Sequence, residues 1–155
     1  MNLRTLSAAL LMVGAGVAYA DGWVVQPVKL QVGNAPAGQG IELKADGSVL
    51  SPEGKLIAKV AGNELRAPDG SVILRQSKDG SVEGKGLPMK VSFTADDELQ
   101  FEGGKLYFDP TGALYGQKNG QSAKAVPGMK LPELKGHARR LPLLLYLTYF
   151  SFAAK

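Results

Sequence analysis

The side chains that most often carry enzymatic chemistry are scarce in this chain of 155 residues. It has no cysteine and a single histidine, His137. Without cysteine there are no disulfides, thiolate metal sites, iron–sulfur clusters or thiol nucleophiles. A Ser-His-Asp triad would have to use His137, which lies in the basic segment Lys-Gly-His-Ala-Arg-Arg, and the G-x-S-x-G nucleophile motif does not occur. We therefore predict a solvent-facing linker histidine and a protein that is not an enzyme.

Turn geometry explains most of the acidic residues better than catalysis does. Asp96-Asp97-Glu98 is the nearest approach to a calcium site, but the spacing matches neither an EF-hand nor a nonapeptide calcium roll. Gly84-Lys85-Gly86 and Gly103-Gly104-Lys105 set glycine beside lysine without a Walker or dinucleotide pattern. We predict no catalytic residue, no metal ligand and no cofactor, with weak calcium binding at Asp96-Asp97 as the alternative.

The elements that would position these side chains are short strands separated by turn pairs. From residue 41 onward, apolar residues alternate with polar ones between Asp-Gly, Asn-Gly and Gly-Gly pairs, and Asp-Gly-Ser-Val occurs three times, starting at Asp46, Asp69 and Asp79. Such pairs suit type I′ hairpin turns, in which both central residues have positive φ. Alternation with period two predicts an antiparallel sheet with one apolar face.

The apolar face of this sheet must be covered, which shapes the predicted fold. Leu56, Ala58 and Val60 are expected on the covered face. Four apolar residues fall on the other face, which we interpret as cross-strand pairs or a second contact surface: Ile57, Ile73, Tyr107 and Tyr115. The predicted fold class is mainly β, an antiparallel meander of short hairpins forming a curled sheet or a partly open barrel.

Residues 1–20 have the pattern of a cleavable secretory signal peptide. Arg4 supplies a positive charge, an apolar stretch follows, and Ala18 and Ala20 are the small residues before the cleavage site. We therefore predict a signal helix that is removed, and an exported protein located in the periplasm or outside the cell. The absence of cysteine suits a bacterial envelope.

The C-terminal region differs from the sheet in charge. Residues 21–117 carry ten Lys and Arg against thirteen Asp and Glu, whereas residues 118–155 carry seven against one. We divide the mature chain into a β-meander domain over 21–126, a basic linker rich in Pro and Gly over 127–140, and an apolar segment over 141–155. The basic charge lies in the tail and aromatic residues make up only 7%, so nucleic acid is not predicted as a partner.

The apolar segment admits three interpretations. The first is a helix packed on or inside the sheet, because runs of 10 to 14 apolar residues are more often buried than membrane-spanning. The second is an interfacial membrane segment whose basic flank meets anionic head groups. The third is a final β-strand. Six residues are candidates for a membrane or partner contact: Arg139, Arg140, Leu141, Leu144, Tyr146 and Phe150.

These features predict a function without naming a ligand. The leading hypothesis is an exported, non-enzymatic structural or binding protein of the cell envelope; its partner is unknown, and an envelope component or an anionic membrane surface is a candidate. One alternative is a peripheral protein held at an anionic membrane surface by its basic and apolar C-terminal segment. Another is a carrier of a small lipophilic molecule, in which the curled apolar face holds a ligand instead of the tail.

Overall fold

The computed structural model describes residues 17–18, 22–30, 40–85, 87 and 89–148. The predicted signal peptide therefore lies outside the described residues, apart from the two residues of strand β1 (Val17–Ala18), which pairs with β2 (Val24–Val25). Phe150 also lies outside the described residues.

One antiparallel sheet of twelve strands forms the body of the protein, and its strand order follows the sequence from β3 to β14. This confirms the predicted meander of short hairpins. The strands are β3 (Val28–Leu30), β4 (Ile41–Leu43), β5 (Ser48–Leu50), β6 (Leu56–Ala61), β7 (Glu64–Arg66), β8 (Val72–Gln76), β9 (Ser81–Glu83), β10 (Val91–Phe93), β11 (Leu99–Phe101), β12 (Gly104–Phe108), β13 (Ala113–Lys118) and β14 (Lys124–Lys130).

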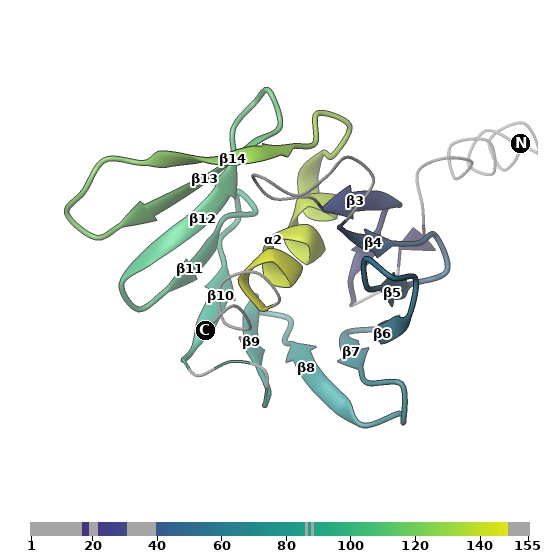
Figure 1. Ribbon diagram of the computed structural model, residues 1–155. Helices are drawn as coiled ribbons and strands as arrows, with labels where there is room; N and C mark the ends of the chain where they lie inside the picture. The colour runs from purple at the N-terminus through teal and green to yellow at the C-terminus, as the bar shows by residue number, and fades with distance from the viewer. Residues whose placement is uncertain (1–16, 19–21, 31–39, 86, 88, 149–155) are drawn as a thin grey trace, which may run out of the picture.

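The sheet curls into a nearly closed barrel, with β3 and β14 as its two edges (Figure 1). A hydrogen bond links the chain beside these edges: Gln26 Nε2 donates to the backbone oxygen of Glu133 at 3.1 Å. Curling shelters the apolar face and brings the edge strands, which expose unpaired backbone groups, close to each other.

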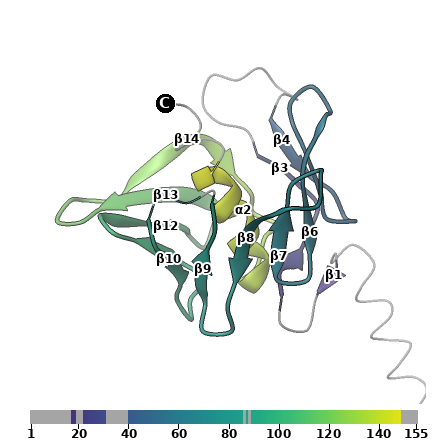
Figure 2. The ribbon, with the colours of Figure 1, turned by 90° about the horizontal axis from the view of Figure 1, so that it is seen from below.

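A short helix fills the inside of the barrel. The 3₁₀ helix η1 (Gly136–Arg139) leads into α2 (Arg140–Tyr146), and the two views show α2 enclosed by the curved sheet (Figures 1 and 2). Leu141, Leu143, Leu144 and Leu145 are 0% exposed. A helix that is apolar on all sides is expected where it is enclosed, and the predicted C-terminal helix inside the sheet is confirmed.

Strand β2, near the N-terminus, packs against the two helices near the C-terminus, η1 and α2. Trp23 is 1% exposed, its ring meets that of Phe93 edge to face at 6.0 Å, and its backbone nitrogen donates to the oxygen of Gly62. The segment predicted as a linker, 127–140, contains the second half of β14 and all of η1.

The repeated turns lie where the sequence places them, but their predicted geometry is wrong. In the first copy, Gly47 N donates to Lys44 O and Lys44 N donates to Ser48 O, which leaves three residues in the loop. Gly47 has φ +90°, whereas Asp46 is not in the left-handed region. This is a type I turn followed by a left-handed residue, which needs positive φ at one position only.

Two β-bulges correct the predicted faces of β6 and β8. Leu56 pairs with Leu50 and Ala58 with Val49, so Ile57 is an extra residue in its strand. Ile57 packs against the core, whereas Leu56 is 37% exposed, because a bulge changes which residues point inward. Ile73 is the extra residue of a second bulge and also packs against the core.

Tyr107 and Tyr115 form a cross-strand pair, as one of the two interpretations predicted. They are register partners on β12 and β13, and their rings stack with centroids 5.7 Å apart.

Candidate functional site

One type of turn occurs six times among the described residues, and one of these copies departs from the others. Each copy has the hydrogen bonds of the Lys44–Ser48 turn, and the copies begin at Lys44, Ser51, Ala67, Ser77, Thr94 and Asp109. Five have glycine at the fourth position, but the copy that begins at Thr94 has Asp97 there, with φ +63°. A non-glycine residue rarely adopts this conformation, so such an outlier is a reason to look for a function.

The carboxylate of Asp97 meets the helix inside the barrel. Arg140 Nε donates to Asp97 Oδ1 at 2.6 Å, and His137 Nδ1 lies 2.5 Å from the same oxygen. The side chains of Asp97 and Arg140 are 10% and 16% exposed, whereas that of His137 is 62% exposed. The ion pair between Asp97 and Arg140 is therefore shielded from water, and the histidine contact is not.

The remaining polar atoms of Arg140 are also used. Nη1 donates to Gln76 Oε1 at 3.2 Å, Nη2 donates to the backbone oxygen of Thr94 at 3.3 Å, and the guanidinium lies over the ring of Phe93, 5.2 Å from its centroid. Gln76 is itself 6% exposed. We call Gln76, Thr94, Asp97, His137 and Arg140 the helix anchor, because they tie the first residue of α2 to the end of β8 and to the turn between β10 and β11.

Arg139 fastens the helix to a second place in the sheet. Its Nε donates to the oxygen of Leu134 at 3.1 Å, and its two terminal nitrogens donate to the oxygens of Phe108 and Asp109 at 3.3 Å. These carbonyls lie at the end of β12 and the start of the next turn. The two adjacent arginines thus bind protein groups on both sides of the helix start.

The structure places the six predicted contact residues as follows. Leu141 and Leu144 are fully buried, Tyr146 is half-buried, the arginines are half-buried and hydrogen-bonded within the protein, and Phe150 lies outside the described residues. In this conformation a membrane could reach the two leucines only if the helix left the barrel. The predicted membrane or partner contact stays a prediction.

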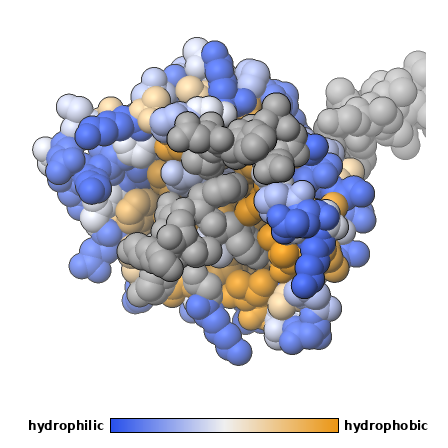
Figure 3. Space-filling model, viewed as in Figure 1, coloured by the Kyte–Doolittle hydropathy of each residue, from blue (hydrophilic) through white to orange (hydrophobic). Residues whose placement is uncertain are grey.

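A pocket lies between β11 to β14 and the end of α2. Its volume is about 490 Å³. Its floor includes Phe101, Leu106, Val126 and Tyr146, and lysines line it as well: Lys105, Lys118 and Lys124. We call it the mouth pocket. In the space-filling view, hydrophobic side chains show mainly in the lower middle and on the right of the described surface, and hydrophilic ones lie around the outer edge (Figure 3).

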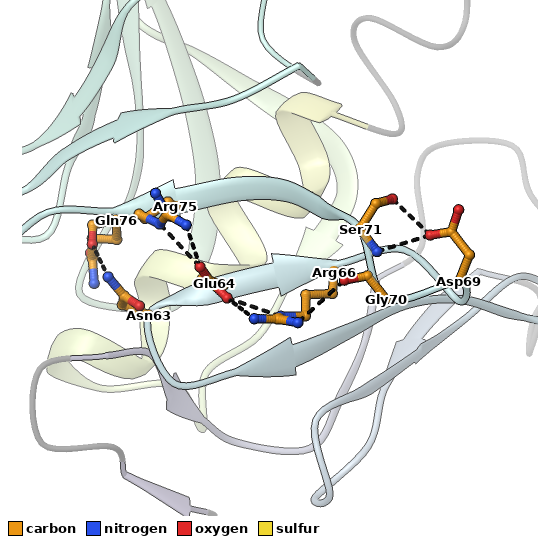
Figure 4. Close-up of polar contacts among 8 residues, drawn as sticks. All are labelled: Asn63, Glu64, Arg66, Asp69, Gly70, Ser71, Arg75 and Gln76. Carbon is orange, nitrogen blue, oxygen red and sulfur yellow. Dashed lines mark hydrogen bonds and ion pairs between the residues drawn. The ribbon is translucent and has the colours of Figure 1, made fainter.

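The acidic side chains of the turns are occupied by local hydrogen bonds. Asp69 Oδ1 accepts from the backbone nitrogen and the hydroxyl of Ser71 at 2.9 and 2.7 Å (Figure 4). The hydroxyl and the backbone N–H hold the pKa of Asp69 below its usual value, and the same two contacts from Ser81 lower the pKa of Asp79. These carboxylates order hairpins, which is the turn role predicted for them.

A second acidic group, Glu64, forms ion pairs on the outer surface of the sheet. Glu64 on β7 forms ion pairs with Arg66 on the same strand and with Arg75 on β8 (Figure 4). The hydrogen bonds from Arg75 and then Arg66 lower the pKa of Glu64. The three side chains form an exposed ion-pair cluster, and such surface pairs contribute little to stability individually.

Comparison with protein-family models, with curated proteins and with solved structures finds no match to this chain. Among the described residues, no group of three or more His, Cys, Asp or Glu is placed to hold a metal ion. None of the helices in the described part of the chain has the length and apolar character needed to cross a membrane.

Proposed function

We propose that this chain is an exported, non-enzymatic binding protein of the cell envelope. The observation that carries the proposal is the mouth pocket, because a concave, mainly apolar site with a few polar groups is typical of small-molecule binding. The polar groups that lie close together outside this pocket have structural roles, which supports a protein without catalytic residues. The helix anchor joins α2 to the sheet, and the turn carboxylates accept bonds from their own hairpins.

Export rests on the sequence of residues 1–20, which the proposal treats as a signal peptide cleaved before Asp21. The test is expression of the full chain in a bacterium, cell fractionation and intact mass of the recovered protein. We expect periplasmic or extracellular protein that begins at Asp21. Ala20→Gln should block cleavage, because signal peptidase reads that position, whereas Tyr19→Gln, at a position that it does not read, should be processed normally. Cytoplasmic protein that retains residues 1–20 would contradict export.

The non-enzymatic part of the proposal has its own test. Purified protein is assayed against ester, glycoside, peptide and phosphate substrates. We expect no turnover above that of the substrates incubated without protein. A reproducible hydrolase activity that disappears when a single carboxylate is replaced would overturn the proposal.

Carriage of a small lipophilic molecule is a second candidate, and the apolar floor of the mouth pocket favours it. Because α2 fills the centre of the barrel, such a ligand would lie beside the helix and not in its place. Native mass spectrometry of protein purified without detergent should then show a bound lipophile. Protein that carries no such adduct, and gains none when lipid is added, would reject this candidate.

A further inference from the structure

We propose that the mouth pocket binds a free amphipathic carboxylate, with its hydrocarbon chain on the apolar floor and its carboxylate between Lys118 and Lys124. This inference rests on the proposed function as a binding protein and names its ligand class. Three observations carry it: the side of the sheet on which the two lysines lie, the space left by a strand glycine, and the unmatched positive charge.

Strand register places the two lysines on the inner face of the sheet. Leu106, which is buried, pairs with Gly116, and Gly116 pairs with Lys124. Gly104, two residues before Leu106, pairs with Lys118. Directly opposed residues of antiparallel strands share a face. Lys118 and Lys124 therefore lie on the same face as the buried leucine, at the end of β13 and the start of β14.

Gly116 opens the space in front of these lysines. It lies inside β13 without positive φ, so its backbone does not require glycine. A Cβ atom there would meet one neighbour within 4 Å, Leu106 Cδ2 at 3.3 Å. By contrast, a Cβ at Gly104 would meet a backbone oxygen at 2.2 Å. A strand glycine of this kind marks a place where another molecule can approach the backbone closely.

The charge at the pocket is positive and unmatched. Lys105 pairs with Glu98 at 3.1 Å, whereas no ion pair joins Lys118 or Lys124 to any described residue. Both lysines are exposed, so they retain water until a ligand arrives. An apolar floor excludes a small hydrophilic anion such as phosphate as the best ligand, and the two ammonium groups disfavour a cation. A carboxylate with a hydrocarbon chain fits both features, because the chain can contact the apolar floor and the carboxylate can pair with the two lysines.

The test is calorimetric titration of the full mature chain with three probes of equal chain length: decanoate, decanol and decyltrimethylammonium. We expect saturable binding of decanoate, at least tenfold weaker binding of decanol, and no binding of the cation. Affinity for carboxylates should rise about fourfold for each added methylene until the floor is covered. Decanoate binding that is absent, or no stronger than that of decanol, would overturn the proposed ligand class.

Variants locate the site. Gly116→Leu fills the pocket and should abolish decanoate binding, whereas Ser92→Leu, on the outer face of β10, should leave it unchanged. The double variant Lys118→Gln/Lys124→Gln should weaken decanoate at least tenfold but leave decanol unchanged, and Lys29→Gln/Lys59→Gln is its control. The lysine variants keep the proposal testable if Gly116→Leu does not fold. Decanoate binding that survives these changes in folded protein would contradict the site.

The outcomes separate this inference from the proposed function. If decanol binds and Gly116→Leu abolishes its binding, while decanoate does not bind, the ligand class is wrong and the binding function stands. If none of the three probes binds to folded protein, the pocket is not a site for amphipaths, and the inference fails together with the observation that carries the proposed function. Binding to anionic vesicles in place of free decanoate would also overturn it, because the ligand would then be a membrane surface.

Discussion

Replacing Asp97 by glycine separates two effects that act in opposite directions. Glycine is the residue at this position in the other five copies of the turn and adopts its φ of +63° without strain. Judged by backbone conformation alone, Asp97→Gly should stabilise the protein. Judged by the helix anchor, the same change leaves the guanidinium of Arg140 without its carboxylate inside the barrel.

The magnitudes decide between the two effects. Removing one partner of a buried ion pair costs about 3–5 kcal/mol. The lower end applies because Arg140 is 16% exposed and keeps its bonds to Gln76 and to the carbonyl of Thr94. Glycine removes the strain of the left-handed conformation at position 97, which stabilises the fold by about 1 kcal/mol. We therefore expect Asp97→Gly to destabilise the fold by about 2 kcal/mol, which lowers the melting temperature by about 4–8 °C in a domain of this size.

The assay is chemical and thermal unfolding followed by circular dichroism. Asp96→Asn, in the neighbouring exposed residue, is the matched control and should change stability by less than about 0.5 kcal/mol. A double-mutant cycle with Arg140→Met isolates the ion pair. Because each single variant leaves an unpaired group, the double variant should be less destabilised than the sum by about 1–3 kcal/mol.

Two results would show that Asp97 does not hold the helix through Arg140. If Asp97→Gly were as stable as the native chain or more stable, the carboxylate would not hold the helix. If the effects of Asp97→Gly and Arg140→Met simply added, the two side chains would not interact in solution.

Three further predictions concern the core and the turns. Leu144→Ala, at a fully buried position, should cost about 2–5 kcal/mol in urea unfolding, against less than about 1 kcal/mol for Leu56→Ala at a 37% exposed position; equal costs would contradict an enclosed helix. Gly80→Ala should lower the melting temperature far more than Gly120→Ala. Both glycines have positive φ, but only at Gly80 would a Cβ meet a backbone oxygen, at 2.6 Å, and a similar loss in both would show that φ alone decides. Asp79 has a lowered pKa in the folded protein, so its stabilising contribution is complete above the unfolded value of about 3.8 and is lost as the pH falls through the lower folded value. Asp79→Asn should therefore reduce the drop in unfolding midpoint between pH 5 and pH 2.5, and an unchanged drop would contradict this.

The hairpin meander and the enclosed helix could be predicted because their signals are local. Alternation of apolar residues and the position of the turn pairs depend on neighbours in the sequence, and the apolar run 141–154 needed cover in any fold. The turn type was wrong because an Asp-Gly pair suits both a two-residue and a three-residue loop. The faces of Leu56 and Ile57 were wrong because a bulge depends on the partner strand.

The helix anchor could not be predicted from local pattern, because Asp97 and Arg140 are 43 residues apart. A signal was nevertheless present in the sequence. Aligning the six turns places Asp97 in a column of glycines. A residue with a side chain is strained in the left-handed conformation of this position, so it needs a compensating contact. His137 was predicted to face solvent, which is correct for most of its surface but misses its contact with Asp97.

The mouth pocket also had a sequence signal that the pattern analysis missed. Gly116 interrupts the alternation of β13 without lying in a turn, and lysines follow it at the two positions that register places on the inner face. A glycine inside a strand calls for an explanation in terms of space, and here that space is the pocket.

Native-state amide hydrogen exchange can measure whether the barrel encloses its own C-terminal helix. The amides of Leu145 and Leu147 should exchange only through global unfolding, with the same opening free energy as central amides of β8 and β12. Exchange of these helix amides at the rate of an unstructured peptide, while the strands stay protected, would contradict the account.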